Sequence, residues 1–194
     1  MLPERAGDMQ TLFRSHSEPR DGYRVRGVCM YGIAECQRAD LAVELLGRGD
    51  IAGFGRLMTL HHDGDRVARL KDGAMQPEAK DYSDARMDQL IRDAESNDSV
   101  ARARAHLWAQ PGAYNVSVPE LDMLVDLALE VEGVMGAGLV GAGLGGSMAA
   151  LVRAESAKGL VKVLAEKYYK ARNLPVRAEI VAPVAGAGII EMPI

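Results

Sequence analysis

Apolar residues over positions 23–46 recur three and four places apart, which is the spacing of one face of an α-helix. The positions that share this spacing are Val25, Val28, Cys29, Gly32, Cys36, Ala39, Val43 and Leu46. We expect them to form the buried side of one long helix, which ends at Gly47 and Gly49. Asp50 is then a suitable N-cap for a second helix. Its expected buried side comprises Ile51, Phe54, Leu57, Met58 and His61. The two segments together predict a helical hairpin.

The next part of the chain has weaker periodicity. Residues 64–82 are charged and interrupted by Gly and Pro, so we expect a surface loop. Ser83 is placed to cap a short helix with apolar positions at 87, 90, 91 and 94, and a second short helix is predicted over about 100–108. Arg102 and Arg104 on that helix could meet phosphate, but solvated arginines are the commoner case.

A capped helix and two strands are predicted in the following segment. Ser117-x-x-Glu120 has the form of a capping box, and Pro119 falls in the first turn, where its missing N–H costs nothing. This helix would run to about Val131, with Gly133 as its stop. Residues 134–140 and 147–152 are strand candidates on either side of a Gly-rich loop. Small residues there would permit close approach of backbones.

The C-terminal part predicts one more helix and a short sheet segment. Residues 155–172 are amphipathic, and the helix is closed by Asn173 and Pro175. Its expected inward positions are Leu160, Val161, Leu164, Tyr168 and Ala171. Residues 176–181 alternate as a strand, 183–188 would turn, and 189–192 could return as an edge strand. This order predicts an α+β plait, an antiparallel sheet with helices on one face, preceded by the helical hairpin and a helical insertion.

Composition narrows the class of protein. A chain of 194 residues can bury one core with an appendage, and its hydrophobic share of 48% is ordinary for a globular protein. The net charge of −4 gives no reason to expect nucleic acid as a partner. Residues 1–22 are charged throughout, which is unlike a signal peptide, so we expect a polar leader or linker remnant, with a loop at 15–22. We expect a cytoplasmic protein without a membrane partner.

Two groups of chemically active residues have ordinary interpretations. Cys29 and Cys36 lie seven residues apart on one predicted helix, a rise of roughly 10 Å, beyond the reach of a disulfide. We therefore expect reduced core thiols, as in the cytosol. The run His61-His62-Asp63-Gly64-Asp65 contains metal-ligand types, but adjacent residues at a helix end point to different sides. We expect solvated residues there and no metal site.

The stretch 133–146 contains seven glycines, and the cluster at 141–146 predicts a loop whose successive N–H groups could cradle an anion. So many glycines make a poor membrane helix, and no polybasic flank is present. The spacings 136-138-141 and 141-143-146 match a dinucleotide fingerprint, but residues 158–170 are helical where that motif needs a second strand. A Walker P-loop lacks its Gly-Lys-Ser/Thr ending. A loop that joins two close-packed strands without a ligand stays open as the alternative.

Three blocks of the sequence resemble the galactokinase branch of the GHMP kinases, in the same order. They are G-D-I-A-G-F-G-R-L-M at 49–58 with His61, Y-N-V-S-V-P-E-L-D at 114–122, and G-A-G-L-G-G at 141–146 with the six residues that follow. The segment 183–188 is similar to a C-terminal strand turn of the family. The resemblance covers about residues 23–194 and implies a GHMP kinase C-terminal domain with an insertion at about 64–111.

The resemblance implies a ferredoxin-like topology and a function in phosphoryl transfer from ATP to a sugar hydroxyl. Carried over by position, the loop beside the ATP phosphates would be Gly141, Ala142, Gly143, Leu144, Gly145, Gly146 and Ser147. The family's phosphate-binding motif and catalytic acid belong to an N-terminal domain, so no catalytic residue or metal ligand is expected in this chain. ATP, Mg²⁺, a sugar and that N-terminal domain are the implied cofactors and partners. A catalytically silent α+β interaction module, possible as a homodimer, is the alternative.

Overall fold

The computed structural model describes residues 6–19 and 22–182, and it confirms an α+β chain. Seven α-helices and two small antiparallel sheets of two strands each are found in this part. Their order is α1 (Ala6–Arg14), α2 (Val25–Gly47), α3 (Ile51–Asp65), β1 (Ala68–Lys71), β2 (Ala74–Pro77), α4 (Asp84–Glu95), α5 (Ser99–Ala105), α6 (Pro119–Leu129), β3 (Val134–Val140), β4 (Ser147–Val152) and α7 (Ala154–Leu164). The turn and edge strand expected after residue 182 lie outside the described residues.

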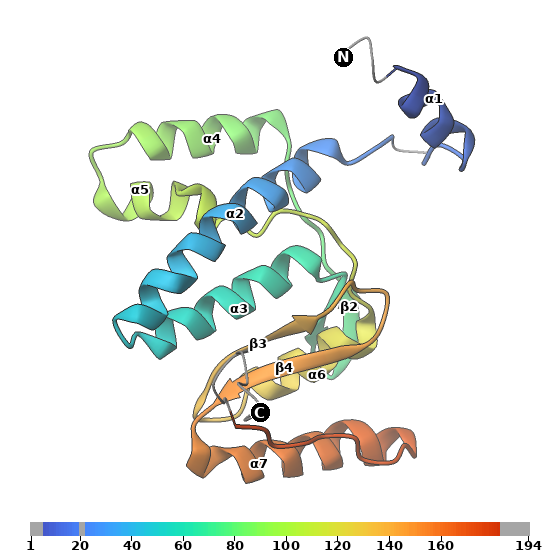
Figure 1. Cartoon of the computed structure of the whole chain (residues 1–194), viewed down its shortest axis with the longest axis vertical. Helices are drawn as coiled ribbons and strands as arrows, with labels where there is room; N and C mark the ends of the chain where they lie inside the picture. Colours follow the sequence, from blue (N-terminus) through green and yellow to red (C-terminus); the bar gives the residue numbers. More distant parts are fainter. Residues whose placement is uncertain (1–5, 20–21, 183–194) are drawn as a thin grey trace, which may run out of the picture.

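The main core lies between the β3–β4 hairpin and helices α6 and α7 (Figure 1). The buried residues of this core are Leu121, Leu124, Val125, Leu127, Ala128, Ala137, Leu139, Leu160, Leu164 and Tyr168. After α7 the chain continues through a π-helical turn (Ala165–Tyr169) and a 3₁₀ turn (Lys170–Arg172) to Asn173, as the predicted helix over 155–172 requires. The α2–α3 hairpin lies on the other side of β3, and α1 extends away from the rest.

Helix α3 takes the place of a third strand along the outer edge of β3. The N–H of Ala137 donates to Thr59 Oγ1 at 3.3 Å, and the N–H of Leu139 donates to His62 Nδ1 at 3.3 Å. Gly136 makes this approach possible, because a Cβ on it would overlap the backbone of Gly55. The close approach expected from the small residues is therefore one between a helix and a strand.

No ferredoxin-like plait is found among the described residues, because the sheet that carries the Gly-rich loop has two strands. The expected strand over 176–181 is wrong. Ile180 and Val181 are exposed, and this segment pairs with no strand of the described chain. Alternation of apolar residues favours an extended segment, but a strand also needs a neighbour for its backbone hydrogen bonds.

The segment 64–82 is not the irregular loop that its charge predicts. It contains the β1–β2 hairpin, which turns at Asp72 and Gly73 with both φ angles positive. Such a turn matches the twist of a two-residue hairpin. Helix α6 binds the hairpin, because Asp122 Oδ2 accepts from the N–H groups of Val67 and Ala68.

The helix termini were predicted with mixed success. Asp50 caps α3 by accepting from the N–H of Gly53 at 2.7 Å, and Ser83 caps α4. The capping box at Ser117 is wrong, since Val118 is the N-cap residue of α6 and makes no side-chain cap bond. Ser117 is buried instead. Pro119 occupies the first turn as expected, and the helix ends at Leu129.

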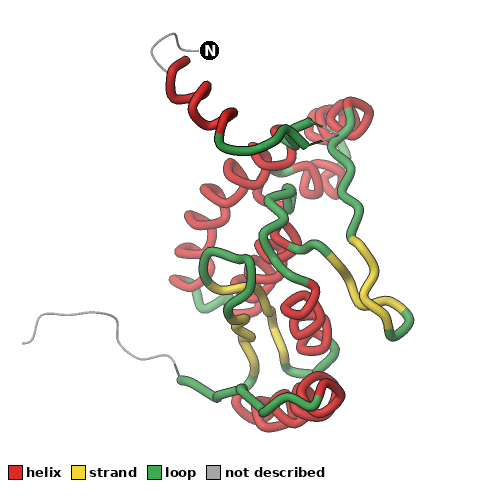
Figure 2. Tube along the Cα trace, turned by 90° about the vertical axis from the view of Figure 1, so that its right-hand side faces the viewer, coloured by secondary structure: helices red, strands yellow, loops and turns green. Residues whose placement is uncertain are grey.

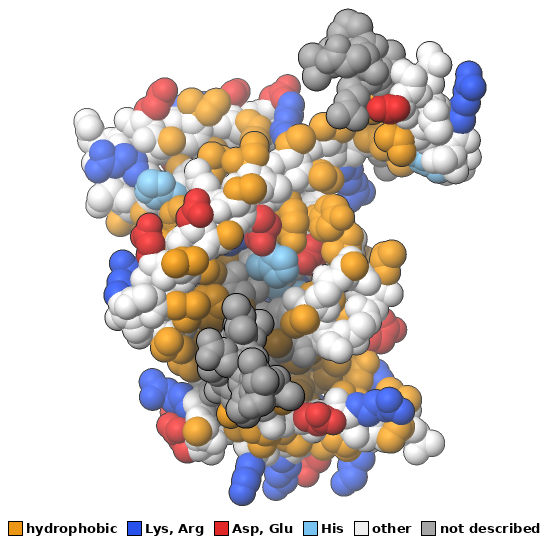
Figure 3. All heavy atoms as spheres, in the orientation of Figure 1, with side chains coloured by type: hydrophobic (Ala, Val, Ile, Leu, Met, Phe, Trp, Pro, Cys, Tyr) orange, Lys and Arg blue, Asp and Glu red, His pale blue; other side chains and the backbone are white. Residues whose placement is uncertain are grey.

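The predicted buried side of α2 is exposed to solvent. All eight positions at that spacing, which we call the α2 apolar face, are exposed, and Cys29 and Cys36 are therefore not core thiols. The helix packs through its opposite side, where its buried residues are Gly27, Ala34, Arg38 and Leu45. Arg38 donates to the carbonyl groups of Trp108 and Gln110, which fixes that orientation. Figure 3 shows hydrophobic side chains along the exposed length of α2.

The residues of α3 that were expected to face inward differ in their burial. Leu57 is buried, Phe54, Met58 and His61 are partly buried, and Ile51 is exposed.

Among the helices of the described residues, none is long and apolar enough to cross a membrane.

Candidate functional site

The Gly-rich loop at 141–146 joins β3 to β4 and carries an unusual backbone (Figure 2). Gly141, Gly143, Gly145 and Gly146 have φ angles between 88° and 121°, and Leu144 has φ 60°. The predicted loop residues are thus brought together, and Ser147 begins β4 opposite Val140. Gly143 lies against Val116, and a Cβ on it would come within 2.6 Å of the Val116 carbonyl oxygen.

Most backbone donors of the loop are unused. The N–H of Leu144 donates to the Val116 carbonyl at 2.6 Å, which fastens the loop to the segment before α6. The N–H groups of Gly141, Ala142, Gly143 and Gly145 donate to no other described residue. Free amides in a left-handed turn are the chemistry of an anion-binding loop. The structure therefore leaves room for the anion cradle predicted from the sequence.

A buried polar chain holds the loop's first strand in place. The Nδ1 atom of His62 accepts from the N–H of Leu139, so the ring proton is on Nε2, which lies 3.2 Å from Asp122 Oδ1. Both side chains are fully buried. The expectation of solvated residues at the end of α3 is therefore wrong for His62, and also for the buried Asp65.

The pKa of Asp122 reflects these contacts. Burial alone would raise it, but the nearby His62 and Ser117 side chains and the backbone N–H groups of Val67 and Ala68 together hold the pKa below its usual value. Asp122 is part of the P-E-L-D block, and its carboxylate is used to bind α3, β1 and α6 together.

A second polar cluster borders an apolar groove of about 300 Å³ next to the start of the loop. The groove lies between α2, α3 and β3, and it is lined by Ala39, Ala42, Phe54, Leu57, Met58 and the residues 138–140. At its side, His61 Nδ1 lies 2.8 Å from Glu35 Oε2, and His61 Nε2 lies 3.3 Å from Asp65 Oδ2. No pattern in the sequence indicates that Glu35, on another helix, meets His61.

His61 is the pH-sensitive member of this cluster. The hydrogen bond to Glu35 raises the pKa of His61 above 6.5, despite the opposing effect of burial. Its stabilising charge is therefore fully present below pH 6.5 and is lost as the pH rises through the higher folded-state pKa. We expect the urea midpoint of the chain to fall between pH 6 and pH 8.5, and His61→Gln to remove most of that fall.

The matched control for this prediction is His106→Gln. His106 is exposed and stacks on Trp108, and no described carboxylate pairs with it. An equal pH dependence in the His61→Gln and wild-type chains, measured by urea unfolding, would contradict the assignment.

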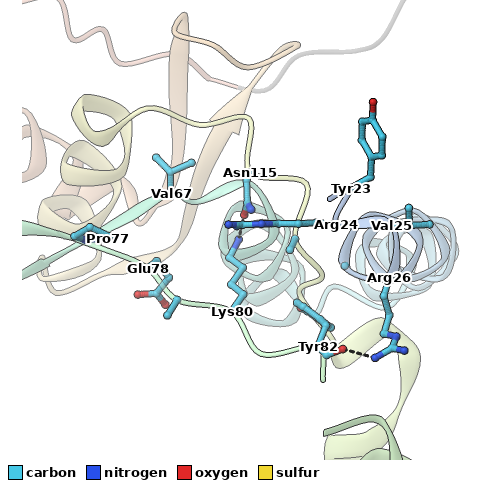
Figure 4. A pocket seen from close by; sticks show the side chains of 13 residues that line it. Tyr23, Arg24, Val25, Arg26, Val67, Pro77, Glu78, Lys80, Tyr82 and Asn115 are labelled. Atoms are coloured by element: carbon cyan, nitrogen blue, oxygen red, sulfur yellow. Dashed lines mark hydrogen bonds between the residues drawn. The ribbon is translucent and has the colours of Figure 1, made fainter. Parts of the chain in front are cut away.

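Another cavity, a cleft of about 910 Å³, lies at the beginning of α2. It is lined by the start of this helix, by residues 77–80 and 82, and by Ala113 and Asn115 (Figure 4). Burial lowers the pKa of Lys80, in this cleft, to about 8. The sequence did not indicate this site, because its residues are far apart in the chain. Arg102 and Arg104 lie elsewhere, both exposed.

Comparison with known proteins finds one matching family model and several distant relatives. A family model described as "GHMP kinases C terminal" matches residues 87–170. The galactokinase of Streptomyces coelicolor is 29% identical over 176 residues, which cover 89% of this chain and 42% of that protein. The galactokinase of Fusobacterium nucleatum is 26% identical over 161 residues, or 83% of this chain and 30% of that protein.

A shorter match is more similar. The galactokinase of Chloroflexus aurantiacus is 40% identical over 76 residues, which cover 39% of this chain and 19% of that protein. The chain thus spans between 19% and 42% of the length of these three relatives. Residues 87–170 thus match a GHMP kinase C-terminal domain, and distant galactokinase homologues cover most of the chain.

Proposed function

We propose that this chain is the C-terminal half of a galactokinase-like sugar kinase, which transfers the γ-phosphoryl group of ATP to a sugar hydroxyl in the cytoplasm. The observation that carries the proposal is the loop at 141–146, where four backbone N–H groups have no partner among the described residues. The loop lies within the part of the chain that matches the family. The residues proposed to support the ATP phosphates are Gly141 to Ser147.

Phosphoryl transfer depends mainly on positioning and on neutralising the charge of the phosphates. Backbone N–H groups at 141–143 and 145 can supply part of that charge stabilisation. Among the described residues no group of three acidic, His or Cys side chains is arranged to hold a metal. Mg²⁺, which neutralises phosphate charge when bound, would be held by the nucleotide together with an N-terminal domain. The group that accepts the sugar proton would also belong to that domain.

The surface beside the loop has the character of a docking site for that domain. The apolar groove of about 300 Å³ reaches Val140, the residue before the loop, and the α2 apolar face continues from it. Val43 is 72% exposed and Val25 is 62% exposed, which is unusual for apolar residues that share one helical face. A ferredoxin-like plait that includes β3, β4, α6 and α7 is part of this proposal.

A second candidate function is a catalytically silent interaction module. The same α2 apolar face favours it, because a homodimer could bury this surface without any nucleotide. The two proposals differ in what the loop is expected to do, since only the kinase half requires it to bind phosphates.

The test is reconstitution with a separately expressed N-terminal domain of a galactokinase-like kinase from the same source. We expect MgATP to raise the melting temperature of the mixture but not of this chain alone, and the mixture to phosphorylate a hexose. Ala142→Asp, at an exposed loop position, should reduce that activity at least tenfold because it adds a negative charge to the cradle.

The matched control is Ala154→Asp at the exposed start of α7, which lies at the other end of β4 from the loop. It should leave the activity unchanged. Dimerisation of the chain with no nucleotide response in the mixture would favour the interaction module. Equal activity of the Ala142→Asp and Ala154→Asp mixtures would contradict the role of the loop.

A further inference from the structure

The cleft at the start of α2 combines an unusual lysine with unused donors. Lys80 Nζ donates to the Gly64 carbonyl at 2.8 Å and to Asn115 Oδ1 at 2.9 Å. Both acceptors are uncharged, and no described carboxylate forms an ion pair with Lys80. An ammonium group has three N–H donors, so one remains for another acceptor. The side-chain N–H groups of Asn115 also have no described partner.

Arg24 adds a second cation to the same cleft. Figure 4 shows its side chain reaching from the start of α2 toward Lys80 and Asn115. Its guanidinium makes no hydrogen bond or ion pair with any other described residue. Arg26 lies beside it but is already engaged by the Tyr82 carbonyl and Asp84. Arg24 and Lys80 are thus the cations left for a ligand.

The negative charges around the cleft are mostly compensated. Glu78 is the one carboxylate among the lining residues, and Arg69 binds both of its oxygens at 3.3 Å. Asp63, Asp65 and Asp122 act on Lys80 from α3 and α6, but they are bound by Arg66 and Arg69, by His61, and by His62 respectively. The lining residues therefore carry a net positive charge.

The size and walls of the cleft indicate what accompanies the anion. About 910 Å³ is within the range of small-molecule sites and is far more than a phosphate ion needs. Tyr23, Pro77 and Tyr82 line it beside the cations. Flat aromatic and proline surfaces suit the carbon faces of a sugar ring, while the two cations and the Asn115 amide suit a phosphate group.

We propose that this cleft binds a sugar phosphate, with the phosphate held by Lys80, Arg24 and Asn115. The proposal concerns this chain alone and does not depend on the function of the Gly-rich loop. The loop and the cleft both contact the segment before α6. The Val116 carbonyl accepts from the N–H of Leu144 in the loop, and the neighbouring Asn115 accepts from Lys80 in the cleft. A ligand in the cleft is therefore placed to influence the position of the loop.

The test is a titration of the ¹⁵N-labelled chain with glucose 6-phosphate, followed by NMR. We expect shifts at the amides of Arg26, Lys80 and Asn115, saturating at millimolar concentration or below. Glucose should cause none of these shifts, and inorganic phosphate should bind more weakly than the sugar phosphate. Binding should fall between pH 7 and pH 9.5, because the ligand stays dianionic while Lys80, with a pKa of about 8, loses its proton.

Two variants make the test specific. Lys80→Gln and Arg24→Gln should each weaken binding roughly tenfold or more, because each removes a charged donor. Arg24 is exposed, so Arg24→Gln remains informative if Lys80→Gln does not fold. Lys162→Gln, an exposed lysine on α7, is the matched control and should bind as the wild type does.

Three results would overturn the proposal. The first is an absence of shifts with glucose 6-phosphate at pH 7. The second is binding that Arg24→Gln leaves unchanged. The third is binding of inorganic phosphate as strong as that of the sugar phosphate, which would leave the sugar without a role.

Discussion

Replacement of Asp122 by Ala is expected to lower the free energy of unfolding by about 3–5 kcal/mol, because each buried donor left without an acceptor costs about 1–3 kcal/mol. The carboxylate is fully buried, and its loss would leave His62 and the N–H groups of Val67 and Ala68 without acceptors. Helices α3 and α6 and the β1–β2 hairpin would loosen together, because Asp122 lies on α6 and these groups belong to α3 and to the start of the hairpin. Urea unfolding followed by circular dichroism measures the change.

The control for Asp122→Ala is Glu130→Ala, which removes another carboxylate just after the same helix. Glu130 pairs with Lys167 at 3.0 Å, but both side chains are more than half exposed. Its loss should cost about 1 kcal/mol or less. Similar costs for the two variants would contradict the assigned role of Asp122.

The direction of the acid transition follows from the same carboxylate. Because its folded-state pKa is below the ordinary 3.8, the stability that Asp122 contributes is present above pH 3.8 and is lost as the pH falls through the folded pKa. Asp122→Ala should therefore flatten this part of the stability profile.

Gly136→Ala is expected to destabilise the chain by about 3 kcal/mol, at the upper end of the cost of overpacking. A Cβ at this position would overlap the Gly55 backbone, which has no side chain that could move aside. Relief would require α3 to shift from β3, and the bonds from Ala137 to Thr59 and from Leu139 to His62 would lengthen. Thermal and urea unfolding both report this loss.

The control is the same substitution where the surroundings are open. Gly159 lies in α7, and a Cβ there would meet nothing within 4 Å. Gly159→Ala should stabilise the chain by about 0.5–1 kcal/mol, since Ala has the higher helix propensity. Opposite signs for the two variants are the expected result, and equal signs would show that the contact between α3 and β3 can relax.

Periodicity predicted the elements of this fold better than their partners. Helix α2 was placed correctly from its apolar spacing, yet that spacing marks the solvent-exposed face. A period tells which residues share a side, whereas Arg38 and its two carbonyl partners decide which side is buried. The β1–β2 hairpin was missed although Asp72 and Gly73 form a turn signal, because the surrounding charges suggested a loop.

The candidate sites differ in how far the sequence could reveal them. The Gly-rich loop is local, so its glycine cluster alone predicts a loop. Its left-handed backbone, which includes Leu144, is known only from the structure. Lys80 and Asn115 are 35 residues apart, and Arg24 comes from another helix, so no local pattern connects them. His62 also looked solvated, since its two partners, Leu139 and Asp122, are distant in sequence.

The hydrogen bonds from β3 to α3 have a consequence for self-association. A strand with unpaired amides along its side is a template for strand addition and for amyloid-like growth. On β3 two of those amides, at Ala137 and Leu139, are already occupied by Thr59 and His62. The side of β3 that faces α3 is therefore closed to a second chain, and the side chains that close it are supplied by a helix.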